Sequence, residues 1–291
     1  MKTYFFMAGL PRSGSTLLSA ILNQNPKIHS SPNSPVLQLM NETAEFLNRD
    51  EMYSANPKPN AAKNTIAGII DNYYSDTNKP IVIDKNRGWP AKIDFITHYL
   101  QQPPKILCPV RDTSEILASF ISMHRRNPFI SSAGKVNFID DMLVKNNIPL
   151  NDDNRCQQLA GGDGVLGSSY NHIKEALMKG YQKQLHFIEY NDLVDGTENT
   201  IRKVYDFLEL DYYEHDYSNI YSVHQERDSE VLGFDDMHHV RSTINKISTD
   251  PKELLSETTI NNCTGAEFWR DIGAFDEQPK TEKETKDGTN D

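Results

Sequence analysis

The segment YFFMAGLPRSGSTLLSAILNQ, residues 4–24, constrains the fold of this 291-residue chain more than any other stretch. Its apolar start, residues 4–8, is typical of a buried strand, and the periodicity of residues 17–22 is typical of a helix. A glycine-containing loop joins the two. The N–H groups of such a loop and the positive end of the helix dipole favour an anion, and the hydroxyls of Ser15 and Thr16 can cap the helix or donate to phosphate oxygens. We therefore expect the chain to begin with a phosphate-binding loop.

This loop differs from that of nucleotide hydrolases. Gly9 and Gly14 have the spacing of the motif G-x-x-x-x-G-K-[ST], but Ser15 stands at the position of the lysine, and Arg12 supplies a cation earlier in the loop. The difference argues against ordinary ATP or GTP hydrolysis. GLPRSGST resembles the 5′-phosphosulfate loop of sulfotransferases that use 3′-phosphoadenosine 5′-phosphosulfate (PAPS), and most closely the PRSGTT or PRSGST of the tyrosylprotein and carbohydrate branch. The resemblance implies that the donor is bound by Pro11, Arg12, Ser13, Gly14, Ser15 and Thr16.

Three more apolar runs are typical of buried strands, a further short strand is expected after the first helix, and stretches with helical periodicity separate these strands. The alternation predicts an α/β protein with a three-layer P-loop-like fold, in which helices flank a central parallel β-sheet. Pro109 indicates that its strand lies at the sheet edge or ends there. The predicted strands are residues 27–31, 81–85, 105–110 and 185–189, and the predicted helices are residues 34–48, 61–74, 89–100, 113–126, 165–178 and 198–208.

The chain is expected to form one domain, residues 1–275, followed by a short tail. Residues 127–165 are polar and rich in loop-forming residues, so we expect a lid or an acceptor-side insertion there, with residues 30–53 completing the acceptor side. Residues 276–291 are charged and have no apolar side chain that could anchor them, which predicts a disordered acidic tail.

A second anion-binding pair follows the predicted strand 105–110. Arg111 leaves this strand, and Ser119 comes eight residues later, about two turns into the next helix. A guanidinium and a hydroxyl can together hold a phosphate. In the sulfotransferases that this chain resembles, such a pair binds the 3′-phosphate of PAPS. Taken alone, the residues are better explained by an ion pair of Arg111 with Asp112 or Glu115 and a serine on the helix surface, and the order of the two motifs along the chain favours the phosphate site.

Other candidate residues also follow predicted strands, whose carboxyl ends meet at one edge of a parallel sheet. The resemblance implies that Lys85 contacts the sulfuryl group and that Tyr190, in a segment similar to RYEDL, lies by the adenine. It also implies that Arg241 and Ser242, in a C-terminal basic loop, close over the 3′-phosphate. The alternatives are a solvated lysine and a partly buried tyrosine at the end of a strand.

No catalytic base can be identified from the sequence. The tyrosylprotein branch has a glutamate where this chain has Asn33, and the cytosolic small-molecule branch has a histidine where it has Arg87. Neither side chain is a good base, and Arg87 could instead bind an anionic acceptor. By position in the sequence alone, the substitutes are His29, Asp84 and His124.

Composition excludes several classes of protein and partner. The formal net charge of −11 disfavours broad nucleic-acid binding. Three widely spaced cysteines are typical of a reducing compartment and predict neither a disulfide framework nor a zinc site. The adjacent His238 and His239 have no third ligand in a metal-binding motif, so no metal is expected. We also expect no membrane span and no signal peptide, and hence a cytoplasmic protein.

The resemblance implies a sulfotransferase that moves a sulfuryl group in line from PAPS to a hydroxyl acceptor and releases 3′-phosphoadenosine 5′-phosphate (PAP). Arg12 and Lys85 would be catalytic, because they would stabilise charge in the transition state. The acceptor could be a small molecule, a carbohydrate or a peptide. Two alternatives stay open, namely a non-catalytic protein that binds PAPS or PAP and a P-loop nucleotide kinase.

Overall fold

The structure of the protein is a computed structural model that describes residues 2–246 and 249–272. The predicted tail, residues 276–291, and the last three residues of the predicted domain lie outside the described residues. Among the helices that are described, none combines the length and the hydrophobicity needed to cross a membrane.

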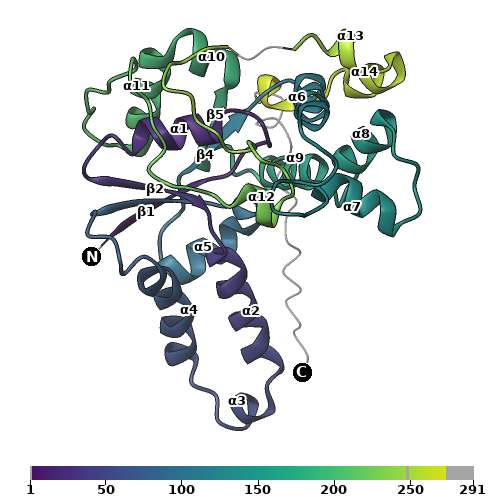
Figure 1. Ribbon diagram of the computed structural model, residues 1–291. Helices are drawn as coiled ribbons and strands as arrows, with labels where there is room; N and C mark the ends of the chain where they lie inside the picture. The colour runs from purple at the N-terminus through teal and green to yellow at the C-terminus, as the bar shows by residue number, and fades with distance from the viewer. Residues whose placement is uncertain (1, 247–248, 273–291) are drawn as a thin grey trace, which may run out of the picture.

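A parallel β-sheet forms the centre of the molecule (Figure 1). In the described residues it has five strands, in the order β2-β3-β1-β4-β5, and every neighbouring pair is parallel. The predicted α/β fold with a central parallel sheet is therefore confirmed. The strands are β1 (Thr3–Met7), β2 (Ile28–Asn33), β3 (Ile81–Lys85), β4 (Ile106–Val110) and β5 (Leu185–Glu189).

Helices cover both faces of the sheet, because side chains on a strand alternate between its faces. On β1, Tyr4 and Phe6 belong to one hydrophobic cluster, and Phe5 and Met7 belong to the other. Figure 1 shows the corresponding layers on the two sides of the sheet. The first cluster includes α2 (Val36–Arg49), α4 (Pro59–Tyr73), α5 (Ile93–Leu100), α6 (Thr113–Arg126) and α9 (Val165–Met178), and the second includes α1 (Ser15–Leu22), α10 (Tyr190–Asp195) and α11 (Thr197–Leu208).

The helices α2 and α4 pack together and form an arm that projects away from the sheet, with α3 (Glu51–Ala55) at its tip (Figure 1). Residues 30–53, which we expected on the acceptor side, run from the end of β2 along α2 into α3. Two 3₁₀ turns, η1 (Trp89–Lys92) and η2 (Gln182–Gln184), complete this part of the chain.

The segment 127–165 contains more regular structure than its sequence indicates. It includes α7 (Phe138–Lys145) and α8 (Asp152–Ala160), two short helices that pack on each other. Asparagine side chains cap both of them, since Asn137 and Asn151 accept main-chain N–H groups of the first turns. The expectation of a mainly loop-like stretch was therefore wrong, because polar faces on short helices hide their apolar periodicity.

Pro109 lies in an interior strand. Since β4 pairs with both β1 and β5, the expected position at the sheet edge was wrong. The expected position at the end of a strand is confirmed, because Pro109 is the next-to-last residue of β4. At this point Gly9 leaves β1 so close to β4 that a Cβ atom on it would lie 2.1 Å from the Pro109 oxygen. The next residue, Leu10, donates its N–H to the same oxygen at 2.9 Å. The loop after β1 is thus fixed against β4.

The chain after α11 returns across the carboxyl ends of the strands in an irregular segment, residues 209–246, which contains the single turn α12 (Asp228–Val231) (Figure 1). The last described elements, α13 (Pro251–Leu254), α14 (Glu257–Cys263) and η3 (Phe268–Asp271), pack near α6 and β5. Arg270 pairs there with Glu189 at 2.7 Å, which ties the end of the described chain to the end of β5.

Candidate functional site

The loop after β1 has a backbone shape that few sequences can adopt. Arg12 and Gly14 both have positive φ, 59° and 89°, a region that is uncommon for residues other than glycine. The hydroxyl of Ser13 donates to the main-chain oxygens of Leu10 at 2.6 Å and Pro109 at 2.8 Å. Ser13 therefore holds the loop from inside, and its side chain does not line the pocket described below.

The amino end of α1 faces this pocket. Gly14 precedes the helix without a side-chain cap, and the three residues that follow it, Ser15, Thr16 and Leu17, line the pocket. The first N–H groups of a helix have no partner within the helix, and the helix dipole makes this end positive. A Cβ atom on Gly14 would lie 3.1 Å from the ring of Tyr190. The site is built to bring main-chain N–H groups close to an anion.

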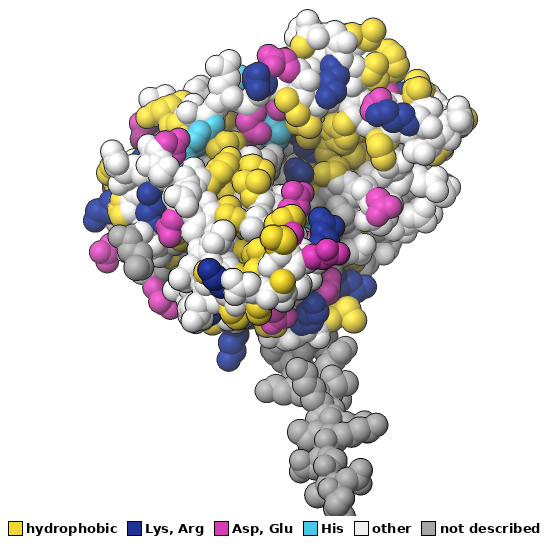
Figure 2. Space-filling model, turned by 90° about the horizontal axis from the view of Figure 1, so that it is seen from below, with side chains coloured by type: hydrophobic (Ala, Val, Ile, Leu, Met, Phe, Trp, Pro, Cys, Tyr) yellow, Lys and Arg dark blue, Asp and Glu magenta, His cyan; other side chains and the backbone are white. Residues whose placement is uncertain are grey.

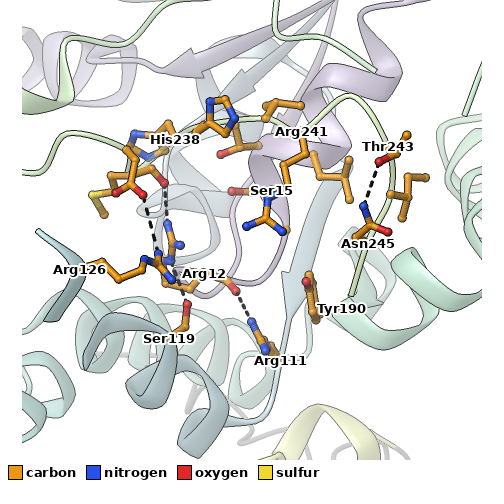
Figure 3. Close-up of a pocket in the computed structure, with 18 of the residues that line it drawn as sticks. Arg12, Ser15, Arg111, Ser119, Arg126, Tyr190, His238, Arg241, Thr243 and Asn245 are labelled. Carbon is orange, nitrogen blue, oxygen red and sulfur yellow. Dashed lines mark hydrogen bonds and ion pairs between the residues drawn. The ribbon is translucent and has the colours of Figure 1, made fainter. Parts of the chain in front are cut away.

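The pocket has a volume of about 180 Å³ and a strongly basic lining (Figure 3). Among the described residues, five arginines and one aspartate line it. Lys, Arg, Asp and Glu side chains are scattered over the outer face shown in Figure 2, so the basic lining is a local feature of a chain whose net charge is −11. Such a concentration of cations in a cavity attracts a multiply charged anion. The charged lining residues are Arg12, Arg87, Arg111, Arg126, Arg241 and Asp236.

Most of the residues predicted to bind the donor meet at this pocket. Three do not line it: Pro11 and Ser13 are buried in the loop, and Ser242 is exposed, with its main-chain oxygen bonded to the N–H of Ile220. The predicted residues that line the pocket are Arg12, Gly14, Ser15, Thr16, Arg111, Ser119, Tyr190 and Arg241.

Arg12 joins three segments of the chain. Its Nε donates to the hydroxyl of Ser119 on α6 at 3.3 Å, and its Nη1 donates to the main-chain oxygen of Met237 at 2.6 Å. Burial lowers the pKa of Arg12, while the carboxylate of Asp236 opposes this shift. The guanidinium is thus held in a fixed position at the wall of the pocket.

Arg111 is held by several contacts at the wall of the pocket. Its Nε donates to Glu115 at 2.8 Å, so the ion pair considered above is present. Its Nη1 donates to the main-chain oxygen of Arg12 at 3.4 Å, and its guanidinium lies 4.2 Å from the centre of the Tyr190 ring. A cation over an aromatic face is stabilised by the ring. These contacts fix Arg111 where it lines the pocket.

Lys85 is buried at the end of β3, beside the pocket-lining Arg87 but not itself among the residues that line the pocket. Burial lowers its pKa to about 8, Glu226 opposes that shift, and Arg87 adds to it. Within the described part of the chain, Lys85 Nζ makes no hydrogen bond or ion pair, and the same is true of the Arg87 guanidinium, which lines the pocket. Burying a cation without a bonded partner costs free energy, so an anion from outside the chain would stabilise both side chains.

Asp84, one of the candidate bases, is part of the core. Its carboxylate accepts hydrogen bonds from Ser34, Tyr74 and the Trp89 indole, and it is fully buried. Burial raises the pKa of Asp84, and these three donors oppose the shift. Because side chains alternate along a strand, Asp84 and Lys85 point to opposite faces of β3. The Asp84 carboxylate is bonded within the core and is not among the residues that line the pocket.

The other two candidate bases also lie outside the lining of the pocket. His29 is half-buried between the rings of Tyr74 and His224, with centroids 5.5 and 5.4 Å away. Burial lowers the pKa of His29, and His224 adds to that shift. His124 is bonded through Nε2 to Asp140 at 2.7 Å. That contact joins α6 to α7.

A cluster of three side chains beside the pocket was not found from the sequence. Glu226, Asp228 and His238 place ligand atoms within 4.8 Å of one another. The spacing would suit a metal ion, but Lys85 and Arg87 act electrostatically on Glu226, and neighbouring cations disfavour another cation. The three residues come from an irregular segment without hydrophobic periodicity, and the only signal in the sequence was the pair of adjacent histidines.

Comparison with known proteins identifies a family. The family model described as the sulfotransferase domain matches residues 2–249. No curated protein sequence matches the chain. The comparisons do not separate the branches of the family, so the closeness to the tyrosylprotein and carbohydrate branch stays a prediction.

Solved structures resemble the fold at low sequence identity. The sulfotransferase domain of the Synechococcus PCC 7002 olefin synthase is 18% identical, with a TM-score of 0.54 over 93% of this chain and 94% of that one. A sulfotransferase domain from the curacin biosynthetic pathway is 18% identical over 98% and 94% of the two chains, with a TM-score of 0.49. A mouse sulfotransferase complexed with PAP is 13% identical over 94% and 89%, also with a TM-score of 0.49. The first of these shows a shared fold.

Proposed function

The chain belongs to the sulfotransferase family, whose reaction is sulfuryl transfer, and on that premise we propose that its donor is PAPS and its product PAP. The observation that carries the proposal is the pocket at the carboxyl ends of the strands, which is lined by five arginines among the described residues. PAP carries phosphates on the 3′ and 5′ positions of one ribose, so it requires anion-binding residues for each of the two.

The loop after β1 is the proposed site of the 5′-phosphosulfate. The helix end at Ser15 and Thr16 offers N–H groups and hydroxyls, and Arg12 offers a fixed guanidinium beside them. The side chain of Ser13 contributes indirectly by holding the loop, whereas Pro11 would contribute only through the shape of the backbone. Gly14 allows the ligand and Tyr190 to approach the helix end.

Arg111 and Ser119 are the proposed ligands of the 3′-phosphate, with Arg241 closing over them. Figure 3 shows Arg241 on the segment opposite Arg111 and Ser119, with the cavity between them. Guanidinium groups bind phosphate strongly because their N–H groups match its oxygens. Tyr190 is proposed to lie beside the adenine, and Ser242 stays a prediction from the resemblance.

Arg12 and Lys85 are the proposed catalytic cations. Sulfuryl transfer resembles phosphoryl transfer in that charge spreads over peripheral oxygens during in-line displacement, so catalysis depends on positioning and electrostatic stabilisation. Both cations are held before any ligand arrives, Arg12 by two hydrogen bonds and Lys85 by burial at the end of β3. The acceptor is a hydroxyl group of a small molecule, a carbohydrate or a peptide, and Arg87 would favour an acceptor with a negative charge.

The proposal places the protein among PAPS-dependent transferases of the EC 2.8.2 type that act in the cytoplasm. Free thiols at Cys108, Cys156 and Cys263 suit a reducing compartment. No specific observation favours the two alternatives, a non-catalytic binding protein and a nucleotide kinase. A kinase would also require the lysine that Ser15 replaces.

The test is a transfer assay with PAPS carrying radioactive sulfur and a panel of phenols, alcohols, sugars and tyrosine peptides. The full chain is expected to release PAP and label at least one hydroxyl compound, and Arg12→Ala is expected to lose the transfer. PAP binding without release from PAPS would instead support a non-catalytic binding protein.

A further inference from the structure

The structure assigns a base that the sequence does not reveal. On the premise of the proposed function, we infer that His238, oriented by Asp228, is the general base that takes the proton from the acceptor hydroxyl. Nothing in the comparisons assigns a role to either residue, and both lie in the irregular segment that follows α11.

One carboxylate orients the His238 ring through two contacts. Asp228 Oδ2 accepts the main-chain N–H of His238 at 2.8 Å, and Asp228 Oδ1 lies 2.7 Å from Nδ1. A carboxylate can only accept, so Nδ1 carries a proton and a neutral ring has its lone pair at Nε2. Burial raises the pKa of Asp228, but the hydrogen bonds from His238 outweigh it and the net shift is downward, which keeps Asp228 ionised.

The ring is at the reacting end of the pocket. His238 lines the cavity, and its Nε2 makes no hydrogen bond with any residue that the structure describes. The preceding residue, Met237, accepts the hydrogen bond from Arg12. Arg12 is the proposed ligand of the sulfuryl end of the donor, and His238 follows directly after the residue that Arg12 contacts, so both side chains line the same end of the chain's basic pocket. Figure 3 shows His238 above Arg12 in the same cavity.

Charges of both signs surround the ring. The carboxylates of Asp228 and Glu226, whose Oε2 is 3.5 Å from Nδ1, stabilise the imidazolium that forms when the base takes a proton. The cations of the pocket oppose protonation of His238. The ion pair Arg126–Asp236 and the exposed His239 are the other charged or titratable groups nearby. The cations near the cluster are Arg12, Lys85 and Arg87.

The proposed step balances in atoms and charge. The acceptor oxygen forms a bond to the sulfur of PAPS while the bond from sulfur to the 5′-phosphate oxygen breaks, and PAP leaves with that electron pair. The proton of the acceptor hydroxyl passes to Nε2 of His238, and the imidazolium later releases it to water. Asp228 is a positioning residue, because it acts through His238 and does not touch the acceptor.

The first test compares His238→Asn with His98→Asn. Asparagine keeps an N–H donor for Asp228 but has no basic nitrogen, and His98 is an exposed histidine at the end of α5, away from the pocket. PAP release from PAPS is measured with water alone and with 2-naphthol or 2-phenylethanol added. We expect kcat of His238→Asn to fall by about 10²–10⁴-fold, and His98→Asn to match the wild type. An unchanged kcat in His238→Asn would overturn the proposal.

Binding of PAP separates this result from a failure of the proposed function. Both variants are expected to keep the increase in melting temperature that PAP gives the wild type, since the phosphate ligands are intact. If the wild type itself shows no increase with PAP, the proposed donor is wrong. If only His238→Asn loses the increase, His238 is a binding residue and the assignment as base is wrong.

The second test examines which ring nitrogen of His238 carries the proton. In ¹⁵N spectra of the histidine side chains, neutral His238 is expected to carry its proton on Nδ1, the nitrogen that faces Asp228. Asp228→Asn is expected to disturb this preference and to shift the pH profile of kcat, whereas a merely structural role would leave the profile unchanged. A proton fixed on Nε2 at alkaline pH would contradict the assignment.

Discussion

Arg12 donates through Nη1 to the main-chain oxygen of Met237 at 2.6 Å, across 225 residues of sequence. This bond connects the loop after β1 to the irregular segment 209–246, so the first and the last third of the chain meet at the pocket. The same guanidinium also contacts α6 through Ser119. Arg12 therefore organises the site and supplies one of its positive charges.

Arg12→Ala is expected to lower kcat about 10²–10³-fold, because a preorganised donor aimed at developing charge is lost. Arg12→Lys keeps the charge but cannot bond to Ser119 and Met237 together, so its rate should lie between those of the wild type and Arg12→Ala. Steady-state rates of PAP release from PAPS give the comparison. Equal rates for wild type and Arg12→Ala would show that the loop arginine is only structural.

Arg111→Ala is expected to abolish the stabilisation of the protein by PAP. Arg202→Ala is the matched control, because Arg202 also lies over an aromatic ring, 3.9 Å from the centre of Tyr212, but outside the pocket. Both changes remove a cation–π contact, so both can reduce intrinsic stability, and Arg111→Ala also removes the ion pair with Glu115. Only Arg111→Ala should remove the PAP-induced increase in melting temperature, and a loss in both variants would argue against a specific phosphate ligand.

Lys85→Met is expected to separate stability from activity. Burial lowers the pKa of Lys85 from 10.5 to about 8, so between these values the unfolded chain binds more protons than the folded one. Through this group, the free energy of unfolding therefore rises as pH increases from about 8 towards 10.5. Urea unfolding at several pH values should show this rise in the wild type and a smaller one in Lys85→Met.

Lys85→Met should be more stable than the wild type at neutral pH, because the buried and desolvated cation is removed. Its sulfuryl transfer should nevertheless be much slower, because a catalytic positive charge is lost. Transfer by the wild type should also weaken above about pH 8, where free Lys85 loses its proton. Unchanged transfer in Lys85→Met would exclude Lys85 from the catalytic site.

Gly9→Ala is expected to destabilise the fold. The new Cβ would lie 2.1 Å from the Pro109 oxygen, so β1 and β4 would have to separate. Overpacking of this kind typically costs about 1–3 kcal/mol. In the control Gly162→Ala no atom lies within 4 Å of the new Cβ, and the free energy of unfolding should change little. Denaturant unfolding of both variants provides the measurement, and equal stability would contradict the close approach of the strands.

The sequence predicted the sheet well because buried parallel strands are nearly continuous apolar runs. Their carboxyl ends also led to Lys85 and Arg111, since the residues that follow parallel strands share one edge. Strand alternation would have excluded Asp84 as a base, because it points to the face opposite Lys85.

The rest of the site depends on contacts that no local pattern encodes. The segment 209–246 has little regular structure, so neither its path nor the meeting of Asp228 with His238 follows from periodicity. The helices α7 and α8 were missed for a related reason, since their short apolar faces are interrupted by charged residues.

The most direct test of the account is the change in melting temperature of the full chain with PAP, AMP, ADP and ATP–Mg²⁺ at equal concentrations. A ligand that binds the native state raises the melting temperature, and PAP differs from AMP only by the 3′-phosphate assigned to Arg111 and Ser119. We expect a large increase in melting temperature with PAP and little increase with AMP, ADP or ATP–Mg²⁺. An increase with ATP–Mg²⁺ and none with PAP would contradict the proposed donor and favour a nucleotide kinase.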